Sequence, residues 1–134
     1  MESPEKRRRT MQAVKSRDTA PEMKVRRLLH AEGYRYRLHL KALPGCPDLV
    51  FPSRQKVLFI NGCFWHGHTC PRGSRVPKSN RQYWERKIAD NRRRDLHNTE
   101  ELEALGWRTL TLWECETKSI DLAALKRFLD DLRR

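Results

Sequence analysis

The spacing of apolar positions along the chain predicts alternating helices and strands. A T-x-x-E pattern from Thr19 to Glu22 is typical of a helix N-terminus, and Gly33 provides a C-terminal stop. Tyrosine and leucine then alternate with charged residues over 34–38, which is the two-residue period of a half-buried strand. The folded part of the chain is therefore expected to open with a helix and a strand.

Two short strands and a long loop are predicted next. Apart from their first residues, Asp48 and Lys56, the runs 48–51 and 56–60 are apolar, and the second is continuous enough to form a central strand buried on both faces. Residues 61–80 are rich in Gly, Pro, Cys, His and Ser, and a loop of that length in a compact domain is usually functional. Three further elements complete the chain: a helix over 80–105 with a second capping box at 79–82, a strand over 107–113, and an amphipathic helix over 122–132.

This order of elements is that of a single α/β domain. A mixed central sheet flanked by helices on both faces is the simplest packing for it. The domain is expected to span residues 19–134, and a chain of 134 residues can bury a core without disulfides. Residues 1–18 form a basic N-terminal arm that we expect to become ordered only on binding.

The charge balance narrows the class of partner. The chain has 29 Lys and Arg against 17 Asp and Glu, a formal net charge of +12 that is typical of proteins binding a polyanion. Much of the excess lies in the arm and in 72–94, on either side of the long loop, where it can contact backbone phosphates. No apolar run is long enough to span a membrane, and because the basic residues 1–9 lead into no apolar stretch, we do not expect a signal peptide. We expect a cytoplasmic, nucleoid-associated monomer.

The long loop contains the densest group of chemically active residues. Two cysteines and two histidines occur within 63–70, and cytoplasmic cysteines stay reduced, which favours metal ligation or burial over disulfides. Zinc prefers thiolate and imidazole ligands, so Cys63, Cys70 and one histidine would form a site if Cys115 returns to it from the far strand. The alternative is a set of ordinary buried cysteines and loop histidines. If His68 is the zinc ligand, His66 is free for proton transfer, or is a surface histidine without a task.

Polar side chains outside the loop offer further candidates. Asp48 opens a strand after a Pro-Gly-x-Pro turn, where a carboxylate can hold Mg²⁺ or simply satisfy the N–H groups of the turn. Lys87, Asn91 and Asp95 share one face of the long helix. Lysine and asparagine there suit base edges or phosphates, and the aspartate suits a metal or its water. The alternative is a solvated helix face.

Two adjacent aromatic residues, Phe64 and Trp65, lie in the otherwise polar loop. Two neighbours in sequence cannot both enter one core pocket, so at least one of them can be exposed. Exposed rings beside basic residues can stack on bases or wedge between base pairs. The alternative is that both rings cover the zinc site.

Three motifs together resemble one enzyme family. They are P-G-C-P-D at 44–48, G-C-F-W-H at 62–66 and W-E-C at 113–115. With them the chain resembles the very-short-patch repair (Vsr) DNA mismatch endonucleases. The resemblance implies a fold similar to type II restriction endonucleases of the PD-(D/E)XK type, a structural zinc, and Mg²⁺-dependent nicking of one strand. The nick is expected 5′ of the T in a T·G mismatch, the product of 5-methylcytosine deamination, and mismatch-repair proteins are candidate partners.

The resemblance also implies roles for individual residues. Asp48 corresponds to a magnesium ligand, His66 to the general base, Asp95 to a carboxylate that holds metal-bound water, and Glu22 to one close to the catalytic histidine. Four residues correspond to the zinc ligands: Cys63, His68, Cys70 and Cys115. Five correspond to DNA contacts, three of them wedges in the duplex and two beside the mismatched pair: Met11, Phe64 and Trp65, then Lys87 and Asn91.

The chain departs from the family pattern at one place. Well-known members have Thr-His where this chain has Ile60-Asn61. Ile60 can still offer its main-chain carbonyl to magnesium, whereas Asn61 can hydrogen-bond a phosphate but cannot carry a proton. Two alternatives therefore accompany the mismatch endonuclease: a zinc-braced module that binds distorted DNA without cutting it, and a nuclease of the same fold with another specificity.

Overall fold

The computed structural model of the chain describes residues 19–64, 66–68, 70 and 78–131. The basic arm, with Met11, and also Trp65 lie outside these residues. The elements in chain order are α2 (Ala20–Ala31), β1 (Arg37–Leu38), β2 (Leu49–Phe51), η1 (Pro52–Arg54), β3 (Lys56–Asn61), α3 (Arg81–Ala104), β4 (Arg108–Trp113), η2 (Glu114–Lys118) and α4 (Leu122–Asp130).

The strands form one mixed sheet in the order β1-β2-β3-β4. The first two pairs are antiparallel, whereas β3 and β4 run parallel with Ile60 opposite Leu112. Because parallel neighbours need a crossover, α3 carries the chain from one to the other. The prediction that the apolar strand is central is confirmed, since β3 lies between β2 and β4.

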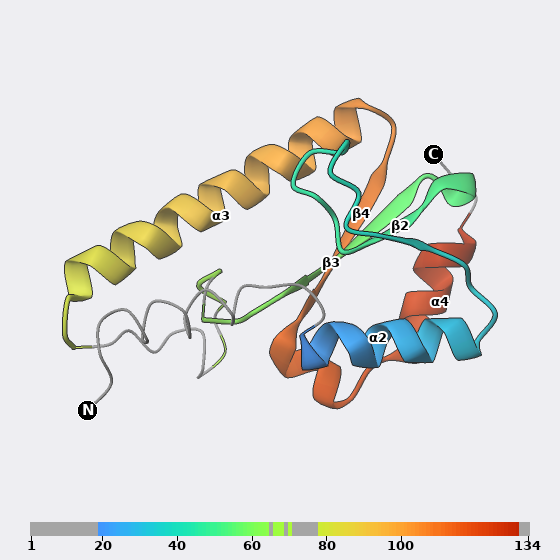
Figure 1. Cartoon of the computed structure of the whole chain (residues 1–134), viewed down its shortest axis with the longest axis horizontal. Coiled ribbons are helices and arrows are strands. Elements are labelled where there is room, and N and C mark those ends of the chain that lie inside the picture. Colours follow the sequence, from blue (N-terminus) through green and yellow to red (C-terminus); the bar gives the residue numbers. More distant parts are fainter. Residues whose placement is uncertain (1–18, 65, 69, 71–77, 132–134) are drawn as a thin grey trace.

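Helices cover both faces of the sheet, as predicted. On one face α2 and α4 pack against the sheet and form a hydrophobic core with it. The buried residues of this core are Val25, Leu29, Tyr34, Leu49, Phe51, Leu58, Leu125 and Leu129. On the other face Leu102 of α3 packs against Val50 and Val57. Figure 1 shows α3 on the opposite side of the strands from α2 and α4, with its N-terminal half extending past the sheet. None of the described helices is long and apolar enough to cross a membrane.

The predicted capping box of α2 is confirmed, whereas at α3 the helix starts within one residue of the prediction but its predicted capping box is wrong. The Thr19 hydroxyl accepts a hydrogen bond from the Glu22 N–H at 3.4 Å, as an N-cap should. At α3 the N-cap is Asn80, which has φ 57° and makes no side-chain cap bond. An N-cap side chain reaches the first turn from extended backbone, so the left-handed conformation of Asn80 prevents the capping box predicted at 79–82.

The strand predicted over 34–38 is shorter in the structure. Only Arg37–Leu38 pairs with β2, while Tyr34 and Tyr36 pack their rings edge-on against Phe51. The hydroxyl of Tyr34 donates to Asp130 at 2.8 Å and that of Tyr36 to the Arg26 carbonyl at 2.9 Å. The alternation thus predicted which rings are buried, but side-chain contacts to the helices replace the strand ladder there.

Candidate active site

A buried polar cluster lies where the first turn of α2 meets the strands. Glu22 is 2% exposed, and its carboxylate oxygens lie 2.9 and 3.1 Å from His39 Nε2. Asp48 Oδ1 lies 3.8 Å from the same nitrogen. One potential ligand atom from each side chain lies within 4.8 Å of the other two. This Glu22–His39–Asp48 cluster has the spacing to hold a metal ion.

The main chain fixes Asp48 between two strands. Its Oδ2 accepts a hydrogen bond of 2.7 Å from the Ile60 N–H, twelve positions along the chain, so its role is not confined to the turn before β2. Burial raises the pKa of Asp48 to about 6; the Ile60 N–H opposes this effect and the Glu22 carboxylate adds to it. A cation beside these two carboxylates would relieve the burial and repulsion that raise this pKa.

His66 forms a pair with Asp95 near the carboxyl end of β3. The Nδ1 of its ring lies 2.5 Å from Asp95 Oδ2, and the main-chain N–H of His66 donates to the Gly62 carbonyl at 3.3 Å. The imidazole also packs edge-on against Trp113 at the end of β4. Because Nδ1 faces the carboxylate, Nε2 is the nitrogen left to exchange a proton with a substrate.

Glu22 and Asp95 make contacts that the family resemblance does not mention. The contacts that the structure shows for the Glu22 carboxylate are with His39 and Arg26, and Asp95 is the carboxylate beside His66. The sequence does not single out His39 as a site residue, because it occupies one polar position of the strand predicted from the alternating pattern. Its φ of 46° takes it out of that pattern and brings its ring to the carboxylates.

The long loop and the end of β4 bring together a second cluster. Ligand atoms of Cys63, His68, Cys70 and Cys115 all lie within 4.8 Å of one another, so they could hold one metal ion. The Cys115 N–H donates to Cys63 Sγ at 3.3 Å, and Cys115 Sγ lies 3.5 Å from His68 Nδ1. Cys115 therefore returns to the loop, and it is His68 rather than His66 that joins the cysteines.

The loop is held against α3 at a glycine between the two histidines. Gly67 has φ +62°, and a Cβ added there would lie 2.6 Å from Ile88 Cγ2 and 3.1 Å from Arg92 Cδ. A side chain at this position would both strain the backbone and overlap the helix. The close approach of Gly67 to α3 thus fixes the positions of its two chain neighbours, His66 and His68.

We expect Gly67→Ala to destabilise the protein much more than the control Gly33→Ala. Gly33 also has positive φ, +92°, but nothing lies within 4 Å of an added Cβ, so only backbone strain is introduced there. Overlap with Ile88 should cost about 1–3 kcal/mol of unfolding free energy beyond the strain. Urea unfolding of both variants measures the difference, and equal losses would show that the loop does not depend on this contact.

The residues expected to contact DNA are placed differently from one another. Phe64 packs on Trp84 of α3 with ring centroids 5.5 Å apart, and the Lys87 ammonium lies 5.9 Å from the centre of the Tyr83 ring. Asn91 is only 7% exposed, so the alternative of a fully solvated helix face does not hold for this residue. Nearby on α3, Gly67 of the loop lies against Ile88 and Arg92.

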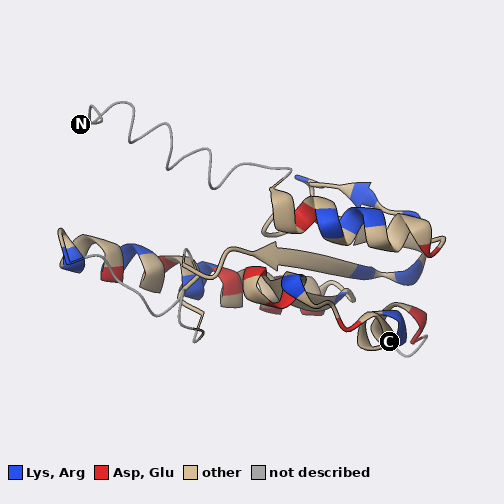
Figure 2. Ribbon diagram, turned by 90° about the horizontal axis from the view of Figure 1, so that it is seen from below, with Lys and Arg blue, Asp and Glu red and all other residues tan. Residues whose placement is uncertain are grey.

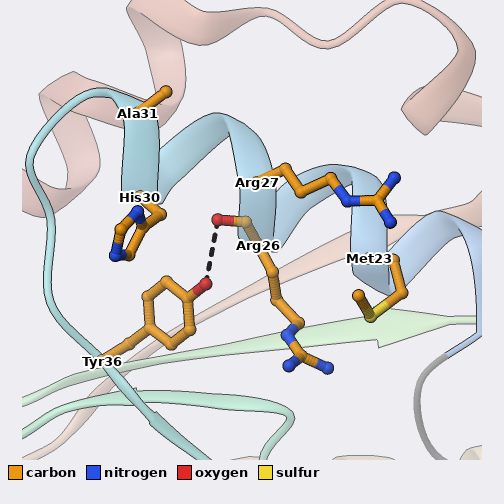
Figure 3. A pocket seen from close by; sticks show the side chains of 6 residues that line it. All are labelled: Met23, Arg26, Arg27, His30, Ala31 and Tyr36. Atoms are coloured by element: carbon orange, nitrogen blue, oxygen red, sulfur yellow. Dashed lines mark hydrogen bonds between the residues drawn. The ribbon is translucent and has the colours of Figure 1, made fainter.

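Basic residues of α2 line a shallow pocket that the sequence did not predict. Figure 3 shows the hydrogen bond that the Tyr36 hydroxyl donates to the Arg26 carbonyl of α2 at this pocket. In Figure 2, Lys and Arg colour much of α2. The pocket is lined by Met23, Arg26, Arg27, His30, Ala31 and Tyr36.

Comparison with known proteins identifies the relatives of the chain. The family model described as DNA mismatch endonuclease Vsr matches residues 1–72. The type II nicking enzyme V.XorIIP of Xanthomonas oryzae pv. oryzae is 54% identical over 130 residues, which cover 97% of this chain and 93% of that protein. The DNA mismatch endonuclease Vsr of Escherichia coli K12 is 40% identical over 109 residues, covering 81% and 69%. The chain therefore belongs to the Vsr family of DNA mismatch endonucleases.

Proposed function

We propose that this DNA endonuclease nicks one strand of a duplex on the 5′ side of the T in a T·G mismatch. The observation that carries the proposal is the position of two reactive groups at one end of β3. The Ile60 N–H binds Asp48 there, and the loop that follows β3 supplies His66 with its partner Asp95. Metal binding and proton transfer, the two requirements of phosphodiester hydrolysis, thus have neighbouring side chains available.

The residues at the Glu22–His39–Asp48 cluster fit a divalent cation. Two buried or half-buried carboxylates face each other, and their repulsion is part of what keeps the pKa of Asp48 high. Asp48 would hold Mg²⁺, together with the main-chain carbonyl of Ile60. When bound, such an ion stabilises negative charge on the attacked phosphate and the leaving oxygen.

His66 supplies the proton transfer in this proposal. Its Nε2 accepts a proton from the attacking water, while Asp95 holds Nδ1 and stabilises the imidazolium that forms. Asn61, the last residue of β3, donates a hydrogen bond to a phosphate oxygen and takes no part in proton transfer. The chemistry of this chain therefore relies on one histidine where familiar relatives have two.

Duplex binding uses the basic and aromatic residues around this edge of the sheet. Lys and Arg of the arm, of α3 and of α2 contact backbone phosphates, which positions the DNA without reading its sequence. Phe64 already packs on Trp84, so it enters the duplex as part of an aromatic pair. Met11 and Trp65 are proposed as further wedges, and Lys87 and Asn91 as neighbours of the mismatched pair.

Strand-resolved nicking of oligonucleotides tests this function. Duplexes carrying T·G, T·A or C·G at one position, each strand labelled separately, are incubated with the full chain with and without Mg²⁺. A nick confined to the T strand of the T·G duplex, and dependent on Mg²⁺, is expected. Equal cutting of matched duplexes would indicate a nuclease of another specificity, and binding without any cut would indicate a non-cutting module.

We also propose that the Cys63–His68–Cys70–Cys115 cluster holds a structural zinc. Four protein ligands leave no open position for substrate, so the ion would brace the loop that positions His66. Burial raises the pKa of Cys63 to about 12, and a bound cation offsets this by stabilising the thiolate. The conformation of the loop and the position of His66 would then both depend on this ion.

Cys115→Ser is expected to lose the zinc and most of the nicking activity. Metal analysis of the purified wild type should give about one zinc per chain, and the variant much less than that. Cys46 lies outside the cluster, so Cys46→Ser is the matched control and should keep its zinc. A Cys115→Ser protein with full zinc content and unchanged thermal unfolding would contradict the assignment.

A further inference from the structure

His39 is a buried imidazole that the reaction proposed above does not use. Its side chain is 8% exposed, and its Nε2 faces the carboxylates of Glu22 and Asp48. The backbone conformation, φ 46°, is uncommon for a residue other than glycine, and the His39 N–H donates to the Asp48 carbonyl at 3.1 Å. The chain thus carries this ring to the candidate metal site in a conformation that a regular strand would not give.

We propose that His39 is a nitrogen ligand of the divalent cation at the Glu22–His39–Asp48 cluster, which gives this nuclease a preference for Mn²⁺ and similar transition metals over Mg²⁺. This inference rests on the proposed metal site at Asp48. It adds one nitrogen ligand to a site whose other ligands are carboxylate oxygens.

The distances within the cluster fit three ligands of one ion. Two atoms that each lie about 2.1 Å from a metal are about 3 Å apart at a right angle and about 4.2 Å apart across the ion. His39 Nε2 lies 2.9 Å from Glu22 Oε2 and 3.8 Å from Asp48 Oδ1. The first distance fits neighbouring positions around a single ion, and the second lies between the neighbouring and the opposite spacing.

A purely structural role for the imidazole is less consistent with its surroundings. Glu22 already has a cationic partner, since Arg26 one turn along α2 lies 3.3 Å from the same Oε2 atom. Asp48 has the Ile60 N–H on its other oxygen. The ring is therefore not the sole compensation for either carboxylate, and a cation held by all three side chains accounts for its position between them.

The ligand set determines which metal is preferred. Mg²⁺ takes oxygen ligands almost exclusively, whereas the divalent transition metals also accept imidazole nitrogen, Mn²⁺ less strongly than Co²⁺ or Ni²⁺ but more strongly than Mg²⁺. A nitrogen at the site should therefore strengthen Mn²⁺ binding much more than Mg²⁺ binding. The preference is a property of the protein without DNA and can be measured apart from nicking.

Pulsed electron paramagnetic resonance of Mn²⁺ bound to the full chain tests the proposal. The cysteine cluster is first filled with one equivalent of zinc, and Mn²⁺ alone is the probe. The wild type should show the coupling of a directly bound ¹⁴N, which becomes ¹⁵N coupling in protein labelled with ¹⁵N-histidine. His39→Asn should lose this coupling, because asparagine tolerates the left-handed backbone but offers no ring nitrogen. His66→Gln should retain it.

Titrations complete the test and separate it from the proposed function. His39→Asn should weaken Mn²⁺ binding at least about tenfold and Mg²⁺ binding, measured by competition, less than about threefold. Asp48-dependent Mn²⁺ binding without nitrogen coupling, or coupling that survives in His39→Asn, would overturn the role of His39 alone. If the wild type binds Mn²⁺ no better than Asp48→Asn, the metal site of the proposed function fails as well.

Discussion

Asp48→Asn is expected to abolish nicking while stabilising the fold of the protein in the absence of added Mg²⁺. A neutral amide binds Mg²⁺ poorly. Without the ion, the negative charge of the transition state loses a stabilisation of several kcal/mol, which lowers the nicking rate at least about 10³-fold. The fold responds in the opposite direction, because burial raises the pKa of Asp48 to about 6 from an ordinary value of 3.8. Asparagine keeps an oxygen that can accept from the Ile60 N–H and removes the buried charge.

The pH dependence of this stabilisation has a definite sign. A carboxyl group whose pKa is raised by folding favours the folded state below pH 4, and this contribution is lost as the pH rises through 6. At pH 7 the ionised Asp48 therefore costs stability, up to about 3 kcal/mol from its pKa and about 1–2 kcal/mol once its partial exposure is considered. Asp48→Asn should recover that amount at pH 7 and little at pH 4.

Urea unfolding at the two pH values, in Mg²⁺-free buffer without chelator, measures the effect. Mg²⁺ at about ten times its Kd for the wild type should stabilise the wild type and have much less effect on the variant, which lacks the Asp48 carboxylate. An Asp48→Asn protein that nicks at the wild-type rate would contradict the metal assignment. A variant less stable than the wild type at pH 7 would show that the carboxylate makes a favourable contact that outweighs its burial.

The sequence predicted the order of elements because apolar spacing reports burial directly. The continuous run at 56–60 became the interior strand β3, and the loop after it became the candidate site. Strand ends and helix caps were less predictable, since they depend on contacts between distant residues. Tyr34 and Tyr36 left the strand pattern to bind the helices, and Asn80 took a left-handed conformation that no local pattern indicates.

The candidate site followed the same division. Residues with distinctive chemistry and spacing, such as the cysteines and Asp48, were found because few other roles require that pattern. Spacing alone left the choice between His66 and His68 open, because both lie near the cysteines in sequence. The family resemblance implied His68, and the fold brings that histidine to the cysteines. His39 looked like an ordinary strand residue, and only the pairing of β1 with β2 brings it beside Asp48. The burial of Asn91 likewise depends on tertiary packing, which the helical spacing alone does not report.

The pairing of His66 with Asp95 leads to the second large effect that we expect. His66→Ala should lower the nicking rate about 10²- to 10⁴-fold by removing the group that accepts the proton of the attacking water. Asp95→Asn should also lower the rate, by about tenfold up to about 10⁴-fold, because the ring loses the carboxylate that sets its tautomer and stabilises its charged form. Neither change should weaken DNA binding by more than about threefold, since neither removes a positive charge needed for phosphate contacts.

A matched control separates this role from general effects on α3. Asp90 lies on the same helix, is largely exposed and pairs with Arg93 at 2.8 Å, away from the candidate site. Asp90→Asn should therefore nick at the wild-type rate, since an exposed ion pair contributes little to stability. Single-turnover nicking of a T·G duplex, with binding measured separately, compares the three variants. Equal losses in Asp90→Asn and Asp95→Asn would show that the charge of α3, rather than the contact with His66, controls the rate.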